Sequence, residues 1–233
     1  MRSWTESTDC SVGKGQAMLE KRKIDYSLYL VTDRSLSLGR SNLEIIKAAV
    51  TGGVTVVQLR EKEATTREVY EQGLKIRDFL REREIPLIIN DRLDIALALD
   101  ADGVHLGQDD MPVAAARKIL GKEKLIGASV FTPAEARAAE AAGADYLGLS
   151  PIFVTSTKPE LTVQIGIDGI SPIRRAVRIP LVGIGSLNAG NAFRAMEAGL
   201  DGVAVVAAIC SHHDPEGAAR AIKAEVMKAK RSR

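Results

Sequence analysis

The sequence predicts a single (β/α)8 TIM barrel of the α/β class, and three observations support this prediction. Short runs rich in Val, Ile and Leu, typical of buried parallel strands, alternate with amphipathic segments of helical period. The alternation occurs eight times with no leftover domain, which favours a closed barrel over an open doubly wound sheet. The length of 233 residues suits one barrel.

Each predicted strand is a mostly apolar run that is followed by a segment of helical period. The strands are predicted at residues 27–32, 55–59, 87–90, 103–106, 125–129, 146–149, 181–184 and 202–206. Three helices also carry start signals. Ser41 precedes an acidic first turn as an N-cap, residues 132–135 form a capping-box pattern with Pro at the first helical position, and Asp214 precedes a similar start.

A repeated joint between a helix end and the next strand also supports the barrel. It occurs at residues 51–54, 100–104, 142–146 and 198–203. In each joint a glycine is expected where a helix C-cap needs left-handed backbone, and an apolar strand follows at once. Repeated use of one βα unit produces such a pattern.

Composition excludes several classes of protein. The 32 basic and 30 acidic residues give no global field for nucleic acid or an anionic membrane surface. No stretch approaches the roughly 20 apolar residues of a membrane span. The polar residues 1–16 contain no apolar segment of a signal peptide. We therefore expect small-molecule substrates, no nucleic-acid partner and no membrane association; a homo-oligomer stays open.

Two cysteines, Cys10 and Cys210, are too few for a disulfide framework and fit a reducing cytoplasm. Cys210 is either a nucleophile or a small apolar residue near a strand end. Residues 1–22 are expected to be a disordered extension, or upstream sequence ahead of the functional start, and residues 23–233 to form the barrel.

Polar residues gather where the predicted strands end, which is the side of a barrel that carries active sites. The second strand runs into Gln58, Arg60 and Lys62, which strand alternation places on one side. Two cations and an amide there suit a polyphosphate, although a solvated loop with a Glu–Lys pair has the same sequence.

The third and fourth strands supply two carboxylates, Asp91 and Asp110. Such a pair suits Mg²⁺, which prefers one or two carboxylates together with phosphate oxygens and water. Another role, compatible with metal binding, is helix capping, by Asp91 for the third helix and by Asp109 or Asp110 for the fourth. His105, inside the fourth strand, is either a buried, hydrogen-bonded structural residue or a catalytic one.

The remaining strand ends suggest a second anion site. The loop at residues 150–159 contains Thr155, Thr157 and Lys158, and it is either a lid over an anionic substrate or an ordinary surface loop. Gly185, together with small residues at the end of the eighth strand, permits a phosphate to approach the backbone closely. Two anion sites across one barrel mouth suit an enzyme that joins a diphosphate to a phosphorylated nucleophile.

The chain resembles the thiamine phosphate synthase family over roughly residues 24–228. The resemblance lies in Gln-Leu-Arg-Glu-Lys at 58–62, Asn-Asp-Arg at 90–92, the segment 102–110, Ser-Pro-Ile-Phe at 150–153 with Thr-Ser-Thr-Lys at 155–158, and Val-Gly-Ile-Gly at 182–185. It implies a transferase that condenses hydroxymethylpyrimidine diphosphate with hydroxyethylthiazole phosphate. Pyrophosphate leaves first, and the thiazole nitrogen then attacks a pyrimidine-stabilised carbocation.

The resemblance also implies a role for each site residue. Pyrophosphate would be bound by Arg60, Lys62, Asn90 and Lys158, Mg²⁺ by Asp91 and Asp110, the pyrimidine by Gln58, and the thiazole phosphate by Thr155, Thr157 and backbone groups around Gly185, Ala208 and Ile209. Ser129 would lie near the reacting centre and, with Lys158, take part in catalysis.

Two positions depart from the family pattern. Ser186 stands where the family has a second glycine, and Ala207 stands where it has serine. Because the thiazole-phosphate site mainly uses backbone groups, we expect binding to weaken but survive. Two rivals remain: a thiazole tautomerase, which would not need the basic diphosphate site, and a catalytically silent barrel that binds a thiamine precursor or acts as a partner subunit.

Overall fold

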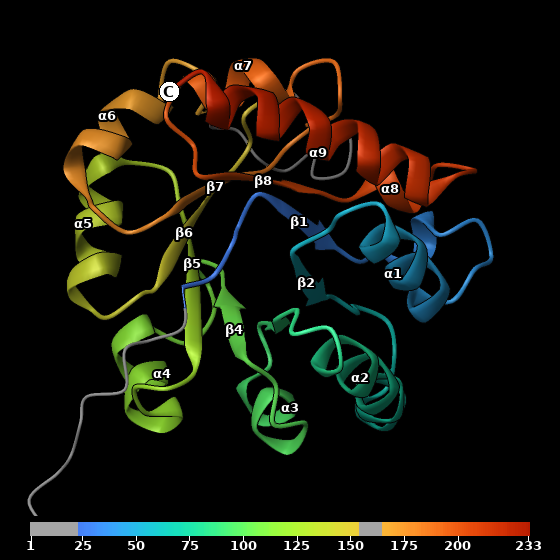
Figure 1. Cartoon of the computed structure of the whole chain (residues 1–233). Coiled ribbons are helices and arrows are strands. Elements are labelled where there is room, and N and C mark those ends of the chain that lie inside the picture. Colours follow the sequence, from blue (N-terminus) through green and yellow to red (C-terminus); the bar gives the residue numbers. More distant parts are fainter. Residues whose placement is uncertain (1–22, 154–164) are drawn as a thin grey trace, which may run out of the picture.

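The computed structural model describes residues 23–153 and 165–233, which form a closed barrel of parallel strands with helices around it (Figure 1). Each strand pairs with its neighbours in sequence, and β1 closes the barrel by pairing with β8. The strands are β1 Leu28–Val31, β2 Val56–Leu59, β3 Leu87–Asn90, β4 Gly103–Leu106, β5 Leu125–Val130, β6 Tyr146–Leu149, β7 Leu181–Gly183 and β8 Gly202–Val205. The (β/α)8 prediction is therefore confirmed.

The helices follow the strands around the outside of the barrel (Figure 1). They are η1 Arg34–Leu36, α1 Asn42–Thr51, α2 Thr66–Arg81, α3 Leu93–Ala98, α4 Val113–Leu120, α5 Pro133–Ala141, α6 Ile170–Ala176, α7 Ala192–Glu197, α8 Ala207–Cys210 and α9 Pro215–Arg231. None of these described helices is long and apolar enough to cross a membrane. Residues 1–22, expected to be a disordered extension, lie outside the described residues.

The core has two layers because successive side chains on a strand point to opposite faces. Leu28 and Leu30 of β1 belong to the larger apolar layer, which includes the buried residues of the surrounding helices. Tyr29 and Val31 belong to a second layer that fills the barrel, together with Tyr26, Val56, Ile88, Leu125, Tyr146, Val182 and Ala204. Three of the nine residues of this inner layer are tyrosines.

The repeated joints that the sequence revealed build one structural device four times. Each residue that directly precedes an even-numbered strand uses a side-chain oxygen to accept the backbone N–H at the start of the preceding odd-numbered strand. The pairs are Thr55 with Leu28 at 3.1 Å, Asp102 with Leu87 at 2.8 Å, Asp145 with Ile126 at 2.8 Å and Asp201 with Leu181 at 2.8 Å. We call these four side chains the strand-start ring; it lies at the end of the barrel opposite the mouth.

The left-handed residue of the joint is not always glycine. Gly53, Gly143 and Gly199 have φ values of 105°, 97° and 121°, as predicted. In the joint at residues 100–104, however, Asp100 takes the left-handed conformation with φ 49°. An aspartate tolerates this backbone better than most residues, so the prediction of a glycine there was wrong.

The predicted helix starts are confirmed in two cases and partly in the third. Ser41 forms a complete capping box with Glu44, and the Asp214 side chain accepts from the Gly217 N–H. The Thr132 side chain accepts from the Glu135 N–H, but the Glu135 carboxylate accepts from the Phe131 N–H at 2.8 Å. The reciprocal half of the predicted box is therefore displaced by one residue.

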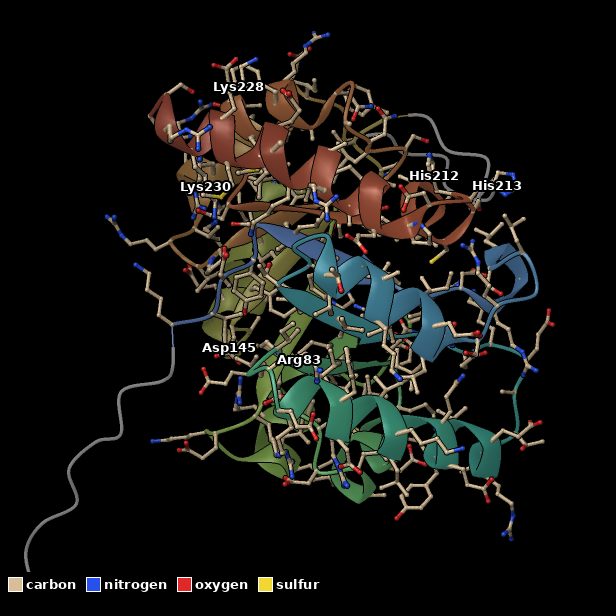
Figure 2. All side chains as sticks on the ribbon, turned by 45° about the vertical axis from the view of Figure 1, so that its right-hand side comes forward. Arg83, Asp145, His212, His213, Lys228 and Lys230 are labelled. Atoms are coloured by element: carbon tan, nitrogen blue, oxygen red, sulfur yellow. The ribbon has the colours of Figure 1, made fainter. Side chains whose placement is uncertain are left out.

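The last helix is tied to the start of the first strand. Asp25 pairs with Lys223 and Lys230 of α9 at 3.3 Å each, and Lys230 also donates to the Ser27 hydroxyl at 2.6 Å. Lys230 lies towards the C-terminal end of α9 (Figure 2). These contacts fasten β1, the strand that closes the barrel, to the helical layer.

Candidate active site

A cavity of about 550 Å³ opens at the barrel mouth, where the carboxyl ends of the strands meet. The structure brings nine of the predicted site residues together in its lining. They are Gln58, Arg60, Lys62, Asn90, Asp91, Asp110, Ser129, Gly185 and Ala208. Thr155, Thr157 and Lys158 lie outside the described residues. A second cavity, of about 580 Å³, lies beside Asp145 and Asp201 of the strand-start ring, away from the strand-end polar groups.

The segment after β2 alternates as the sequence predicted. Gln58, Arg60 and Lys62 line the cavity, whereas Glu61 accepts a hydrogen bond from Asn42 of α1. Burial raises the pKa of the Glu61 carboxyl. The alternative of a solvated loop with a Glu–Lys pair is therefore wrong. Glu61 points to α1, whereas Arg60 and Lys62 point to the cavity.

Arg60 is held in place by a residue that the sequence analysis missed. Its Nη1 donates to Asp33 Oδ2 at 2.8 Å, and both side chains are only about 15% exposed. Its backbone N–H donates to the Thr32 hydroxyl at 3.0 Å. Asp33 directly follows the first predicted strand, residues 27–32, so its position at a strand end was the available signal. The guanidinium is thus fixed at the mouth of the cavity.

The two predicted metal-binding carboxylates both line the cavity, and neither caps a helix. The N-cap of α3 is Arg92 and that of α4 is Pro112, both without a side-chain cap bond. Asp91 Oδ2 accepts from the Asn90 side-chain amide at 2.6 Å, and Asp110 Oδ2 accepts from the Gly107 N–H at 2.7 Å. The helix-capping alternative is therefore wrong for both.

The donor set fits a magnesium ion that also binds substrate. Asp91 and Asp110 come from adjacent strand ends, and both line the cavity beside Asn90. No group of three or more His, Cys, Asp or Glu residues within the described ranges is arranged to hold a metal. Two carboxylates from adjacent strand ends suit Mg²⁺, which completes its shell with phosphate oxygens and water.

Ser129 is linked to the barrel interior through His105. The Ser129 hydroxyl lies 3.0 Å from His105 Nε2, and His105 Nδ1 lies 3.1 Å from the Tyr146 hydroxyl. The Ser129 carbonyl also accepts from the Gln108 side chain. His105 is hydrogen-bonded through both ring nitrogens, is half-buried and lines the cavity, so both possibilities for it stay open.

On the opposite side of the mouth, backbone geometry requires glycine at one position. Gly185 has φ 112°, and a Cβ there would lie 2.9 Å from Pro151 Cα and 3.0 Å from the Ile152 nitrogen. Ser186 and Ala208 line the cavity nearby, without bulky side chains. Ile209 does not: its side chain is fully buried, and its N–H donates to the Val206 carbonyl at 3.1 Å. We therefore remove Ile209 from the candidate site.

Comparisons with known proteins show which family the chain resembles. A family model described as thiamine monophosphate synthase matches residues 28–209. The thiamine-phosphate synthase of Chloroflexus aurantiacus is 53% identical over 203 residues, which cover 87% of this chain and 94% of that protein. That of Haloarcula marismortui is 50% identical over 206 residues, or 87% of this chain and 98% of that protein.

Solved structures give the same result. A thiamine phosphate pyrophosphorylase from Pyrococcus furiosus matches with a TM-score of 0.81 and 40% identity, over 88% of this chain and 97% of that one. A 3-hexulose-6-phosphate synthase matches with a TM-score of 0.65 but only 15% identity, over 85% of this chain and 99% of that one, and so shares the fold alone.

Proposed function

The chain belongs to the thiamine monophosphate synthase family, and from this premise we propose how the residues at its barrel mouth divide the reaction. The enzyme is a transferase that condenses hydroxymethylpyrimidine diphosphate with hydroxyethylthiazole phosphate and releases pyrophosphate. The carbon–oxygen bond to pyrophosphate breaks first, and the thiazole nitrogen then attacks the resulting pyrimidine carbocation. The protein therefore has to stabilise a leaving group and position a nucleophile.

Arg60, Lys62, Asn90 and Lys158 bind the pyrophosphate in this proposal. Negative charge grows on its oxygens as the bond breaks, so fixed cations stabilise the transition state more than the ground state. The carrying observation is that Arg60 and Lys62 converge on one cavity with both aspartates, and that Asp33 already fixes the Arg60 guanidinium. A tautomerase would have no use for this arrangement.

Asp91 and Asp110 would hold Mg²⁺ beside these cations. When bound, the ion would neutralise part of the charge of the pyrophosphate. Asn90 supports this role because its amide donates to Asp91 and keeps that carboxylate oriented towards the cavity that both residues line.

Gln58 faces the pyrimidine, Ser129 lies near the reacting centre, and the thiazole phosphate lies against Gly185, Ala208, Thr155 and Thr157. Gly185 and Ala208 both line the cavity without bulky side chains, which supports this assignment. The departures at Ser186 and Ala207 change side chains next to a site that uses backbone groups. We expect them to lower affinity for the thiazole phosphate without abolishing turnover.

The test is to mix the purified chain with both substrates and Mg²⁺ and to detect thiamine phosphate. Arg60→Ala should lose most of the activity. Arg92→Ala is the matched control, because Arg92 is an exposed arginine that pairs with Asp94 at 2.6 Å outside the cavity lining. No product from the wild type with both substrates, or full activity of Arg60→Ala, would contradict the proposal.

We also propose that the enzyme works in a reducing cytoplasm, a location that its small-molecule substrates and its buried free thiol at Cys210 support. The Cys210 thiol lies 3.7 Å from the Val31 carbonyl, and burial raises its pKa to about 11. A thiol that remains protonated at neutral pH is a poor nucleophile, which favours the structural role. The possibility of a homo-oligomer stays open.

A further inference from the structure

A continuous chain of polar side chains crosses the inside of the barrel beneath the active site. Gln58 Nε2 donates to the Tyr29 hydroxyl at 2.9 Å, and the Tyr29 and Tyr146 hydroxyls lie 2.8 Å apart. Tyr146 reaches His105 Nδ1 at 3.1 Å, and His105 Nε2 reaches the Ser129 hydroxyl at 3.0 Å. All five side chains of this network are among those that line the active-site cavity.

One direction of donation gives every hydroxyl hydrogen and the ring N–H an acceptor within the chain of side chains or at its end. In this direction the Gln58 amide nitrogen donates to the Tyr29 oxygen, and the Tyr29 hydrogen is directed to Tyr146. The Tyr146 hydrogen is then directed to His105 Nδ1. A neutral imidazole that accepts at Nδ1 carries its hydrogen at Nε2, and this hydrogen is donated to Ser129. Among the described residues, no buried side-chain polar atom lacks a hydrogen-bond partner.

The barrel is built to leave room for this chain. A Cβ on Gly127 would lie 2.5 Å from His105 Nδ1, and a Cβ on Gly148 would lie 2.8 Å from His105 Cε1. Any larger residue at these two positions would displace the imidazole. Tyr29 and Tyr146 are 1% and 0% exposed, and burial raises the pKa of both phenols. Both therefore remain hydroxyl groups, able to donate and accept, at any working pH.

We propose that Tyr29, Tyr146 and His105 are positioning residues that hold Ser129 as a hydrogen-bond donor to the bound pyrimidine diphosphate. This inference rests on the proposed function, because it places Ser129 against that substrate. Since the Ser129 oxygen accepts from His105, its own hydrogen is directed to a substrate acceptor. The acceptors that gain charge as the bond breaks are the pyrophosphate oxygens, so this donation favours the transition state.

The first test measures the His105 tautomer directly and needs no substrate. ¹⁵N-histidine NMR of the ligand-free protein should show the neutral Nε2–H form for His105, assigned by loss of the signal in His105→Gln. In Tyr146→Phe, which removes the donor to Nδ1, the Nε2–H preference should weaken. An Nδ1–H form or an imidazolium in the wild type at pH 7.5 (about one unit above the ordinary pKa of histidine) would overturn the inference. This outcome is independent of whether thiamine phosphate is made.

The second test asks whether Tyr146 acts through Ser129. Tyr146→Phe should lower kcat about tenfold with little change in the KM for the pyrimidine diphosphate, since one buried hydrogen-bonding link is lost. The double variant with Ser129→Ala should be no slower than Ser129→Ala alone, because the two residues act as a unit. Additive losses would overturn the proposal.

The matched control is Tyr26→Phe. The Tyr26 ring packs against the Tyr146 ring in the same inner layer, with 4.8 Å between the ring centroids. Tyr26 is not one of the five residues of the hydrogen-bonded network. Its kcat should equal that of the wild type; an equal loss in Tyr26→Phe and Tyr146→Phe would show that packing alone is responsible. If Tyr146→Phe folds poorly, Tyr29→Phe takes its place, because it removes another hydroxyl of the same hydrogen-bonded network. The same loss of kcat is expected for it.

Discussion

Removing Asp145 from the strand-start ring should destabilise the barrel more than removing any other aspartate of that ring. Asp145 Oδ2 accepts from the Ile126 N–H at 2.8 Å and from Arg117 Nη2 at 2.5 Å. The Asp145 and Arg117 side chains are 15% and 17% exposed, and Ile126 is fully buried. Asp145→Ala therefore leaves a buried amide without its acceptor and a shielded guanidinium without its carboxylate.

The size of the effect follows from these two losses. A buried donor left without a partner costs about 1–3 kcal/mol, and a hydrogen bond to a charged group contributes about 1.5–3 kcal/mol. Arg117 keeps its bonds to the carbonyls of Gly121, Lys124 and Gly143, which limits the second loss. We expect Asp145→Ala to lower the free energy of unfolding by about 3 kcal/mol, and the melting temperature by about 6–12 °C.

The other ring positions provide a graded comparison. Asp201 makes the same bonds with Leu181 and Arg174, but its side chain is 44% exposed, so we expect a loss of about 1–2 kcal/mol. Asp102 is exposed and, within the described residues, pairs with no cation, so the expected loss is about 1 kcal/mol. Asp100→Asn is the surface control, since Asn tolerates the left-handed backbone and only exposed ion pairs with Arg81 and Lys124 are lost.

Urea unfolding followed by far-UV circular dichroism, with thermal melts in parallel, measures all four variants. Asp145→Asn should lose clearly less than Asp145→Ala, because the amide oxygen still accepts one hydrogen bond. We attribute the size of the stability loss to burial and to the ion pair with Arg117. Equal losses of unfolding free energy in Asp145→Ala, Asp201→Ala and Asp102→Ala, or a larger loss in Asp102→Ala than in Asp145→Ala, would refute this reasoning.

Three further predictions concern function. Asp91→Ala and Asp110→Ala should each cut turnover strongly while leaving circular dichroism unchanged; full activity of either variant in a chelator-controlled Mg²⁺ titration would remove that residue from the metal site. Lys158→Ala should lower kcat, because about 2–4 kcal/mol of transition-state stabilisation is lost, and it should leave the affinity for the thiazole phosphate nearly unchanged. A loss confined to thiazole-phosphate binding would reassign the residue. Deleting residues 1–17 should leave activity and melting temperature nearly unchanged, which an activity assay and a thermal melt of the shortened chain would check.

The sequence was sufficient to predict the barrel and most of the mouth. Apolar runs locate all eight strands, because parallel strands in a barrel are covered on both faces. Once the strands are located, the residues that end them must meet at one end. For this reason Arg60, Lys62, Asp91 and Asp110 were predicted together although they are far apart in the chain.

What sequence reasoning missed are contacts that depend on which side chains meet across the barrel. Nothing local marks Asp33 as the partner of Arg60, or Tyr146 as the link between Tyr29 and His105. Local backbone choices were also missed: Asp100 takes a conformation that was expected of a glycine. Each of these depends on three-dimensional register rather than on periodicity.

The balance of charge in the active-site cavity has a consequence for how substrate arrives. Of the described residues that line it, Arg60 and Lys62 are cationic, whereas Asp33, Asp91, Asp109 and Asp110 are acidic. A bare diphosphate therefore approaches a cavity whose described lining carries more negative than positive charge, and at low ionic strength this slows association. A diphosphate that already carries a divalent cation meets less repulsion. If Asp91 and Asp110 hold Mg²⁺ as proposed, we therefore expect metal and diphosphate to arrive as one complex rather than one after the other.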